Sequence, residues 1–164
     1  MTLRIRAAAP GDAPLVVDLI RALAQYEKLA HEAIATPAQL DAALFGTPPK
    51  AHALIAEIDG EGIGFALYFF NFSTFLGKAG LYLEDLFVKP HVRGVGAGKA
   101  LLAELARIAV ANDCGRMEWS VLDWNTPSIE FYKALGARPM SDWTTYRLTG
   151  DALTRLAQTP SMRR

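Results

Sequence analysis

Three glycines at alternating positions form the part of this sequence whose residue types point most directly to chemistry. They lie in residues 92–99, which read Val-Arg-Gly-Val-Gly-Ala-Gly-Lys and lead into a segment with helical apolar spacing. Glycines leave backbone N–H groups uncovered at the start of a helix, where the helix dipole also favours anions. The segment therefore predicts a pyrophosphate cradle. Glycine-rich turns before helices are common, so the surrounding sequence must decide whether this one binds phosphate.

Spacing excludes two familiar phosphate-binding motifs. A Walker loop that ended at Lys99 would need glycine at Arg93 and serine or threonine at Ala100. A dinucleotide-binding Rossmann unit would place the glycines after its first strand, with an acidic ribose ligand about 20 residues later at a strand end. Here several β-rich segments precede the loop, and Asp113 lies in an expected turn. A nucleotide-binding regulatory domain stays open only as an alternative that depends on the glycines alone.

The elements that must position this loop follow from patterning before it. Asp12 with Pro14 predicts the start of a helix over residues 13–28, and Thr36 with Pro37 predicts a second one that ends at Gly46. Alternating or β-rich apolar runs predict strands, the second and third as an antiparallel hairpin and the fourth as a central strand. These runs cover residues 3–6, 53–58, 63–70 and 81–88.

Patterning after the loop predicts a helix, a strand, a further helix and a last strand. The helix follows from apolar residues after Lys99, and residues 116–121 form the next strand. Thr126 and Pro127 cap a helix that runs to about Leu135, and residues 144–148 form the last strand. The order β-α-α-β-β-β-α-β-α-β indicates an α/β fold, a mixed central sheet flanked by helices on both faces, in a single domain over residues 1–164.

Composition narrows the classes of function. The 164 residues carry 17 basic and 17 acidic side chains, so no overall field attracts nucleic acid or an anionic membrane. The longest apolar run, residues 63–70, is far shorter than a membrane span, and the first ten residues lack a signal-peptide core. The expectation is a cytoplasmic protein with no nucleic-acid and no membrane partner.

Cysteine and histidine usage predicts neither a disulfide nor a metal centre. Cys114 is the single cysteine, so it cannot pair within the chain and is expected to be structural. His31, His52 and His91 are not spaced as metal ligands, and none is assigned a catalytic role. A nucleophilic route through Cys114 would need a partnered base, and no histidine is near it in the sequence.

Two blocks of sequence carry a resemblance to a known superfamily. The segment Arg-Gly-Val-Gly-Ala-Gly at residues 93–98 resembles the Arg/Gln-x-x-Gly-x-Gly/Ala signature of the GNAT N-acetyltransferases, and residues 124–137 resemble their Asn…Phe-Tyr-x-x-x-Gly segment. Residues 23–27, 81–88 and 146–148 are similar to the spermidine/spermine (diamine) N-acetyltransferases, a subfamily that includes thialysine acetyltransferases. The resemblance implies a GNAT fold, acetyl-CoA as donor, a small primary amine as acceptor, and a homodimer.

The resemblance also implies roles on the donor side. The strand backbone at Leu86, Phe87 and Val88 would pair with the pantetheine amides, and Tyr132 would act as general acid towards the departing thiolate. A purely packing role for Tyr132 beside Phe131 remains the alternative. The expected CoA contacts are Arg93, Gly94, Val95, Gly96, Ala97, Gly98, Lys99, Asn125, Ser128 and Tyr132.

On the acceptor side, a base is useful because an alkylamine with a pKa near 10.4 is only about one part in a thousand neutral at pH 7. Glu84, a carboxylate in an apolar strand, is the candidate base, with its pKa expected to rise by desolvation; a charge at the sheet edge is the alternative. The resemblance implies an acceptor pocket, and its expected residues are Tyr26, Glu27, Glu84, Asp85, Glu118, Trp119 and Ser120.

One departure from the subfamily concerns the acceptor. Its members carry an acid in a Tyr-Asp-Pro-Trp-like stretch, whereas residues 72–75 here read Phe-Ser-Thr-Phe. With Ser73 in place of the acid, spermidine and spermine are expected to be poorer acceptors than short amines. A binding module of the same fold, which senses acyl-CoA without turnover, remains the alternative to an enzyme, and intact Glu84 and Tyr132 argue against it.

Overall fold

The computed structural model describes residues 1–161, which form two compact units. The first unit spans Met1–Leu122, and the second begins at Asp123. The first unit contains the sheet, three of the helices and the glycine loop, whereas the described part of the second contains two further helices.

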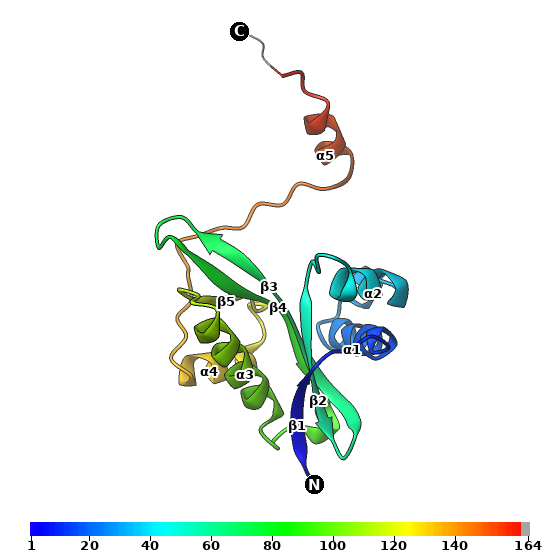
Figure 1. The fold of residues 1–164 in the computed structure, drawn as a ribbon. Coiled ribbons are helices and arrows are strands. Elements are labelled where there is room, and N and C mark those ends of the chain that lie inside the picture. The colour runs from blue at the N-terminus through cyan, green and yellow to red at the C-terminus, as the bar shows by residue number, and fades with distance from the viewer. Residues whose placement is uncertain (162–164) are drawn as a thin grey trace. The chain divides into compact units, whose positions relative to one another are not determined.

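A five-stranded sheet in the order β1-β2-β3-β4-β5 forms the centre of the first unit (Figure 1). The first four strands pair antiparallel, and β5 pairs parallel to β4. Parallel neighbours need a crossover connection, which α3 supplies here. The strands are β1 Leu3–Ala7, β2 His52–Ile58, β3 Glu61–Ser73, β4 Lys78–Val88 and β5 Met117–Trp119. The predicted mixed sheet is thus confirmed, with β5 shorter than expected.

Helices cover both faces of this sheet, as predicted. Two lie on one side, α1 Ala13–Tyr26 and α2 Pro37–Phe45, and α3 Ala97–Ala111 lies on the other (Figure 1). Two short 3-10 turns, η1 Ala30–Glu32 and η2 Pro90–Val92, complete the unit. Helix α1 ends two residues earlier than expected, and Lys28 just beyond it adopts a positive φ of 63°, which no α-helix can continue.

The helix starts follow local sequence with one difference. Thr36 caps α2 as predicted, because its side chain accepts from the Gln39 N–H while the Gln39 side chain accepts from the Thr36 N–H. Asp12 stands at the N-cap of α1 but makes no capping hydrogen bond. Its carboxylate instead accepts from Ala9 N–H and from Arg6, at 2.7 Å each.

The main apolar core lies between the sheet and helices α1 and α2. Ile55, Phe65 and Phe87 stand opposite one another on β2, β3 and β4, so their side chains share one face. Val16 and Leu19 of α1 pack in the same cluster. On the opposite face of the sheet, α3 buries apolar side chains at helical spacing: Leu101, Leu102, Leu105 and Ala109. These two layers fix the ends of β4, where the candidate site lies.

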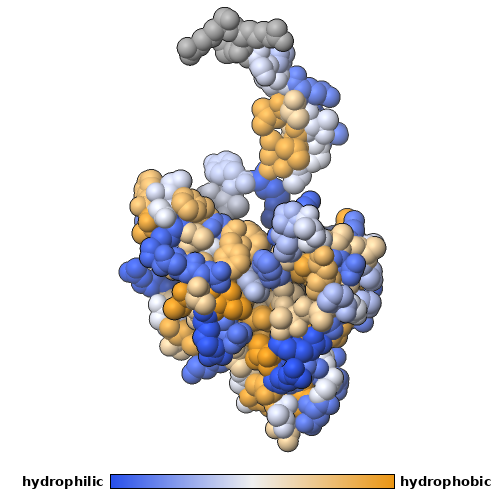
Figure 2. Space-filling view, in the orientation of Figure 1, coloured by the Kyte–Doolittle hydropathy of each residue, from blue (hydrophilic) through white to orange (hydrophobic). Residues whose placement is uncertain are grey.

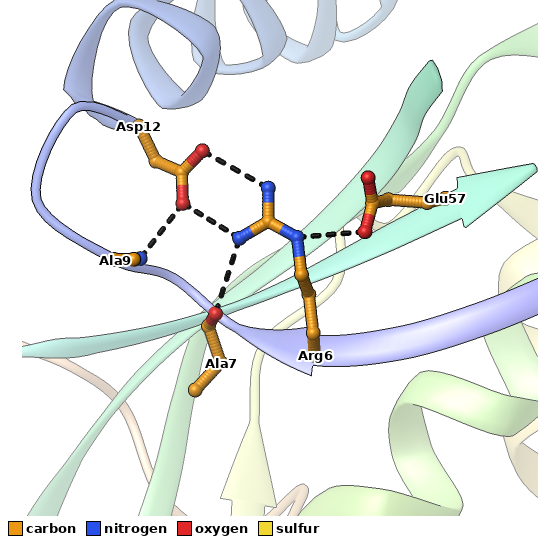
Figure 3. Close-up of polar contacts among 5 residues, drawn as sticks. All are labelled: Arg6, Ala7, Ala9, Asp12 and Glu57. Atoms are coloured by element: carbon orange, nitrogen blue, oxygen red, sulfur yellow. Dashed lines mark hydrogen bonds and ion pairs between the residues drawn. The ribbon is translucent and has the colours of Figure 1, made fainter. Parts of the chain in front are cut away.

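A group of ion pairs ties β1, β2 and the start of α1 together (Figure 3). Arg6 donates two hydrogen bonds to the Asp12 carboxylate, at 2.7 and 3.0 Å, and a third to Glu57 at 2.7 Å. The side chains are largely buried. The hydrogen bond from Arg6 holds the pKa of Asp12 below its usual value, with a further contribution from the Ala9 N–H.

The second unit contains α4 Thr126–Ala134 and α5 Gly150–Ala157. Asn125, not Thr126, caps α4, because its side-chain oxygen accepts from the Ser128 N–H at 3.4 Å and Thr126 is already helical. The last strand predicted for residues 144–148 is wrong. A strand requires a hydrogen-bonded neighbour, and these residues have none in the described chain; Tyr146 is 93% exposed.

Several apolar side chains are exposed on the first unit, and four of them lie near the turn that joins β3 to β4 (Figure 2). These side chains are Phe70, Phe72, Phe75 and Leu76. Among residues 1–161, no helix has the length and apolarity needed to span a bilayer.

Candidate active site

The glycine loop leads from the end of β4 into α3. Gly94 and Gly96 adopt positive φ angles of 93° and 87°, which L-residues rarely accept, and Gly96 is the N-cap of the helix. Gly98 needs no unusual φ, yet a Cβ built there would meet no atom within 4 Å. The loop thus stands against open space at a helix N-terminus, where the first N–H groups have no partner within the helix. An anionic phosphate fits this cradle.

Next to the loop, β4 has an edge without a strand partner. β5 pairs with β4 only from Leu81 to Leu83, and no strand of the described chain continues that side of the sheet. The remainder of β4, from Glu84 to Val88, therefore presents backbone groups that another extended chain can pair with. This open edge runs directly into η2 and the glycine loop.

The open edge begins at a β-bulge. Leu67 pairs with Asp85 and Tyr68 with Leu83, so Glu84 is the extra residue on β4. Bulges are common beside active sites, where they redirect a side chain and end regular pairing. Here the bulge places two consecutive carboxylates where the β4–β5 ladder stops. The sequence does not predict the bulge, because an acidic pair in an apolar strand is its only trace there and does not specify a change of register.

The carboxylates at the bulge take part in none of the ion pairs formed among residues 1–161. In the part of the chain that the structure describes, no lysine or arginine forms an ion pair with Glu27, Glu84 or Asp85. Burial, and then the charges of Glu84 and Glu27, raise the pKa of Asp85 to about 6. Burial also raises the pKa of Glu27. A cation such as an ammonium group is the natural complement of this cluster.

Desolvation was expected at Glu84 but is found at Asp85. Glu84 is exposed, so the burial on which the sequence-based expectation depended is absent there, and Asp85 is the partly buried member of the pair. The reason is the bulge, which turns consecutive side chains away from simple alternation. Glu84 keeps a position at the open edge, where solvent and ligands reach it.

Arg93 lies across the end of β4 towards α1. Its Nε donates to the Val88 carbonyl at 3.1 Å, and its guanidinium carbon lies 4.6 Å from the centroid of the Tyr26 ring. The Phe87 ring is 5.8 Å from the same carbon and 6.5 Å from Tyr26. Lys99 is exposed, as Arg93 is, and lies on the first turn of α3.

The β5 residues predicted for the acceptor pocket stand beside β4. Glu118 and Trp119 pair with Tyr82 and Leu83, and the Ser120 hydroxyl shares a 3.1 Å hydrogen bond with the Tyr82 hydroxyl. Glu118 is already in an ion pair with Arg116 at 3.1 Å, so its charge is partly compensated. Tyr82 is a neighbour that the sequence alone did not single out.

The three remaining predicted residues lie in the second unit, at α4. Asn125 is buried at the N-cap, and Ser128 supplies the N–H that it accepts. Tyr132 is half-buried, with its ring 5.7 Å from that of Phe131. The Asn-x-x-Ser spacing is therefore that of a helix cap, which explains these residue types locally.

Ser73, where the diamine acetyltransferases carry an acid, is buried at the hairpin end and accepts a hydrogen bond from Leu76 N–H at 3.2 Å. It lies six residues along β3 from Leu67, the partner of Asp85, which is roughly 20 Å at the usual strand rise. Within one chain Ser73 is therefore not beside the acidic cluster.

Residues 1–161 contain no group of three or more His, Cys, Asp or Glu side chains arranged to hold a metal ion. Cys114 is partly exposed and unpaired by any disulfide in the described chain.

Comparison with known proteins agrees with this geometry. Residues 17–137 match the Acetyltransferase (GNAT) family. The chain is 38% identical to a thialysine N-epsilon-acetyltransferase of Bos taurus, over 93% of this chain and 96% of that protein. It is 34% identical to an L-ornithine N5-acetyltransferase of Arabidopsis thaliana, over 92% and 86%. An integron cassette protein from the V. cholerae mobile metagenome shares the fold, with a TM-score of 0.81, 28% identity and coverage of 97% and 99%.

The family model covers most of the chain, and both sequence relatives extend along nearly all of it. The family uses an acyl-CoA donor, for which the glycine cradle and the open β4 edge are suited. The chain therefore belongs to the Acetyltransferase (GNAT) family and is an N-acetyltransferase related to thialysine and ornithine acetyltransferases.

Proposed function

We propose that this enzyme transfers an acetyl group from acetyl-CoA directly to a primary amine of a small molecule, with a thialysine-like or diamine acceptor. One observation carries the proposal: the unpaired edge of β4, from Glu84 to Val88, runs into a glycine cradle at the start of α3. A pantetheine arm and its pyrophosphate need these two features side by side. The matched region, residues 17–137, crosses the boundary between the two units, which supports one catalytic domain.

The residues that would hold the donor follow from this arrangement. Leu86, Phe87 and Val88 offer backbone groups to the pantetheine amides, and the loop from Gly94 to Gly98 offers backbone N–H groups to the pyrophosphate. Lys99 adds charge at the loop. Asn125 and Ser128 are proposed as further CoA contacts on the strength of their motif. Acetyl-CoA supplies the acetyl thioester when it is bound.

The acidic cluster serves the acceptor. Glu27, Glu84 and Asp85 form no ion pair within the described residues, so their negative charge can attract a cationic amine. Glu84 accepts one proton from the ammonium, directly or through water, and so leaves a neutral nitrogen that can attack. Tyr26 and the β5 residues Glu118, Trp119 and Ser120 complete the proposed pocket.

The transfer itself exchanges one bond for another. The amine nitrogen forms a bond to the acetyl carbon, the carbon–sulfur bond breaks, and the electron pair of that bond leaves with sulfur. The Tyr132 hydroxyl donates a proton to the thiolate or holds it by a hydrogen bond. The nitrogen loses its second proton as the amide forms. That proton restores the Tyr132 hydroxyl, or passes to the thiolate where Tyr132 only holds it by a hydrogen bond. Of the two ammonium protons, one is then on Glu84 and the other is matched by the proton on the CoA thiol.

Short amines are the proposed acceptors. The uncompensated acids gather around the bulge, and Ser73 stands roughly 20 Å away along the hairpin. A long polycation therefore finds no second acidic group from residue 73 of the same chain. The relatives named for thialysine and ornithine act on amines of this short kind. We also propose a cytoplasmic homodimer, which the exposed apolar tip of the β3–β4 hairpin favours.

The test is a screen of CoA release from acetyl-CoA against thialysine, lysine, ornithine, putrescine, spermidine and aminoglycosides. We expect release with a short amine and none with the Gly96→Val variant, whose side chain blocks the cradle. Gly60→Val is the matched control, because Gly60 has nearly the same φ, 84°, in a turn away from the loop. Absence of release with every amine, or equal loss of CoA binding in both variants, would overturn the proposal.

A further inference from the structure

Arg93 begins the glycine signature, yet its side chain is engaged elsewhere. Two directed contacts define its place: the hydrogen bond from Nε to the Val88 carbonyl, 3.1 Å, and the stacking over Tyr26, 4.6 Å to the ring centroid. Both contacts use features that are particular to a guanidinium, namely a fixed N–H direction and a flat face. A compact ammonium group reproduces neither.

The contacts join two parts of the proposed site. Val88 ends β4, and Arg93 itself opens the loop that holds the donor. Tyr26 ends α1 and is followed by Glu27, a member of the acidic cluster for the acceptor. Phe87, buried in the core between them, contacts both the Tyr26 ring and the Arg93 guanidinium. Arg93 therefore connects the donor side to the acceptor side through one rigid aromatic contact.

We infer that Arg93 is a positioning residue that fixes the end of α1, with Tyr26 and Glu27, against the end of β4, and so sets the affinity for the amine. This inference rests on the proposed function and deepens it. Because the Arg93 guanidinium is held by Val88 and Tyr26, neutralising the pyrophosphate is then the task of Lys99, on the first turn of α3 beside the loop. The two cations that flank the glycines thus have different tasks.

The role of Arg93 in positioning and the role of Lys99 in binding the pyrophosphate predict opposite effects on KM for the amine and on Kd for CoA. Arg93→Lys keeps the charge but loses the flat face and the Nε donor, so it should raise KM for the amine about three- to tenfold. Arg93→Gln should do the same and leave the Kd for CoA, measured by calorimetry, within about twofold. Lys99→Gln should show the reverse, with weaker CoA binding and an unchanged KM for the amine.

Tyr26 provides the second half of the test. Tyr26→Leu should raise KM for the amine as Arg93→Lys does, whereas Tyr26→Phe, which keeps the ring, should recover most of the loss. The double variant Arg93→Lys with Tyr26→Leu should be no worse than the poorer single variant, because both remove one shared contact. A tenfold weaker CoA Kd in Arg93→Gln with unchanged KM for the amine, or multiplicative effects in the double variant, would overturn the inference.

Failure of the proposed function is distinguishable from failure of this inference. If the wild type transfers no acetyl group, the proposed function fails, and Arg93 is then judged by hydrogen exchange of the backbone amides at residues 26–28. Faster exchange in Arg93→Lys than in the wild type supports the positioning role. Unchanged exchange overturns it.

Discussion

Two groups of carboxylates in the first unit are handled in opposite ways. Asp12 and Glu57 surround Arg6, which donates to both, and the pKa of Asp12 falls (Figure 3). Asp85 has no ion-pair partner among the described residues, and burial, with the charges of Glu84 and Glu27, raises its pKa to about 6. The first group joins two strands and a helix start, and each of its carboxylates accepts a hydrogen bond from the Arg6 guanidinium. The second costs stability, and such a cost is typical of a binding or catalytic site.

The comparison predicts that removing a carboxylate from the acidic cluster at the bulge lowers activity, whereas removing one from the group around Arg6 does not. Glu84→Gln should lower kcat/KM for the amine by about 10²- to 10⁴-fold, because the glutamine amide cannot accept the proton. Glu57→Gln is the control and should leave kcat/KM within about twofold. Steady-state assays at saturating acetyl-CoA measure both. Equal losses in the two variants would remove the functional distinction between the groups.

The compensated group should matter most for folding. Arg6→Met leaves the Asp12 and Glu57 carboxylates without their cation, and the free energy of unfolding should fall by about 2 to 3 kcal/mol, less than for a fully buried pair. Arg107→Met breaks the exposed pair with Glu104 and should cost at most about 0.5 kcal/mol. Urea denaturation at pH 7 gives both values, and a cost for Arg6→Met no larger than for the control would contradict the compensated role.

The uncompensated group should respond to pH with the opposite sign. A raised pKa means that protonated Asp85 favours the folded state, so its contribution is present below its ordinary pKa of 3.8 and is lost as pH rises through about 6. Asp85→Asn should therefore raise the free energy of unfolding by about 1 to 2 kcal/mol at pH 8 and by nothing near pH 4.

Asp12 provides the control for that experiment. Its lowered pKa means that its contribution is present above the ordinary value and is lost as the pH falls below about 3.8. Asp12→Asn should therefore destabilise the protein at pH 8. Chemical denaturation of both variants across pH 4 to 8 separates the two signs, and a destabilised Asp85→Asn at pH 8 would refute the account of the acidic cluster.

Much of this molecule follows from local sequence, and the exceptions share a cause. The capping residues of α2, the β2–β3 hairpin and the loop before α3 were all predicted, because each depends on residues close in the chain. Three features were not predicted: the bulge at Glu84, the ion pair of Asp12 with Arg6, and the absence of a strand at residues 144–148. These depend on which strand or cation lies opposite, and local patterning carries no record of that.

The smallest expected effect is that of Ser73→Asp, which tests whether the acidic residues of the acceptor pocket all come from one chain. Ser73→Asp restores the acid of the diamine acetyltransferases, and the new side chain can still accept from the Leu76 N–H. Residue 73 lies roughly 20 Å from Asp85 along the hairpin, about two Debye lengths at 0.1 M salt. The kcat/KM for spermidine should therefore change less than about threefold, relative to the neutral control Ser73→Asn. A larger gain that grows as salt is lowered would mean that a second copy of the chain brings its residue 73 to the site. In that case the acceptor pocket would be shared between subunits, and polyamine use would depend on the dimer.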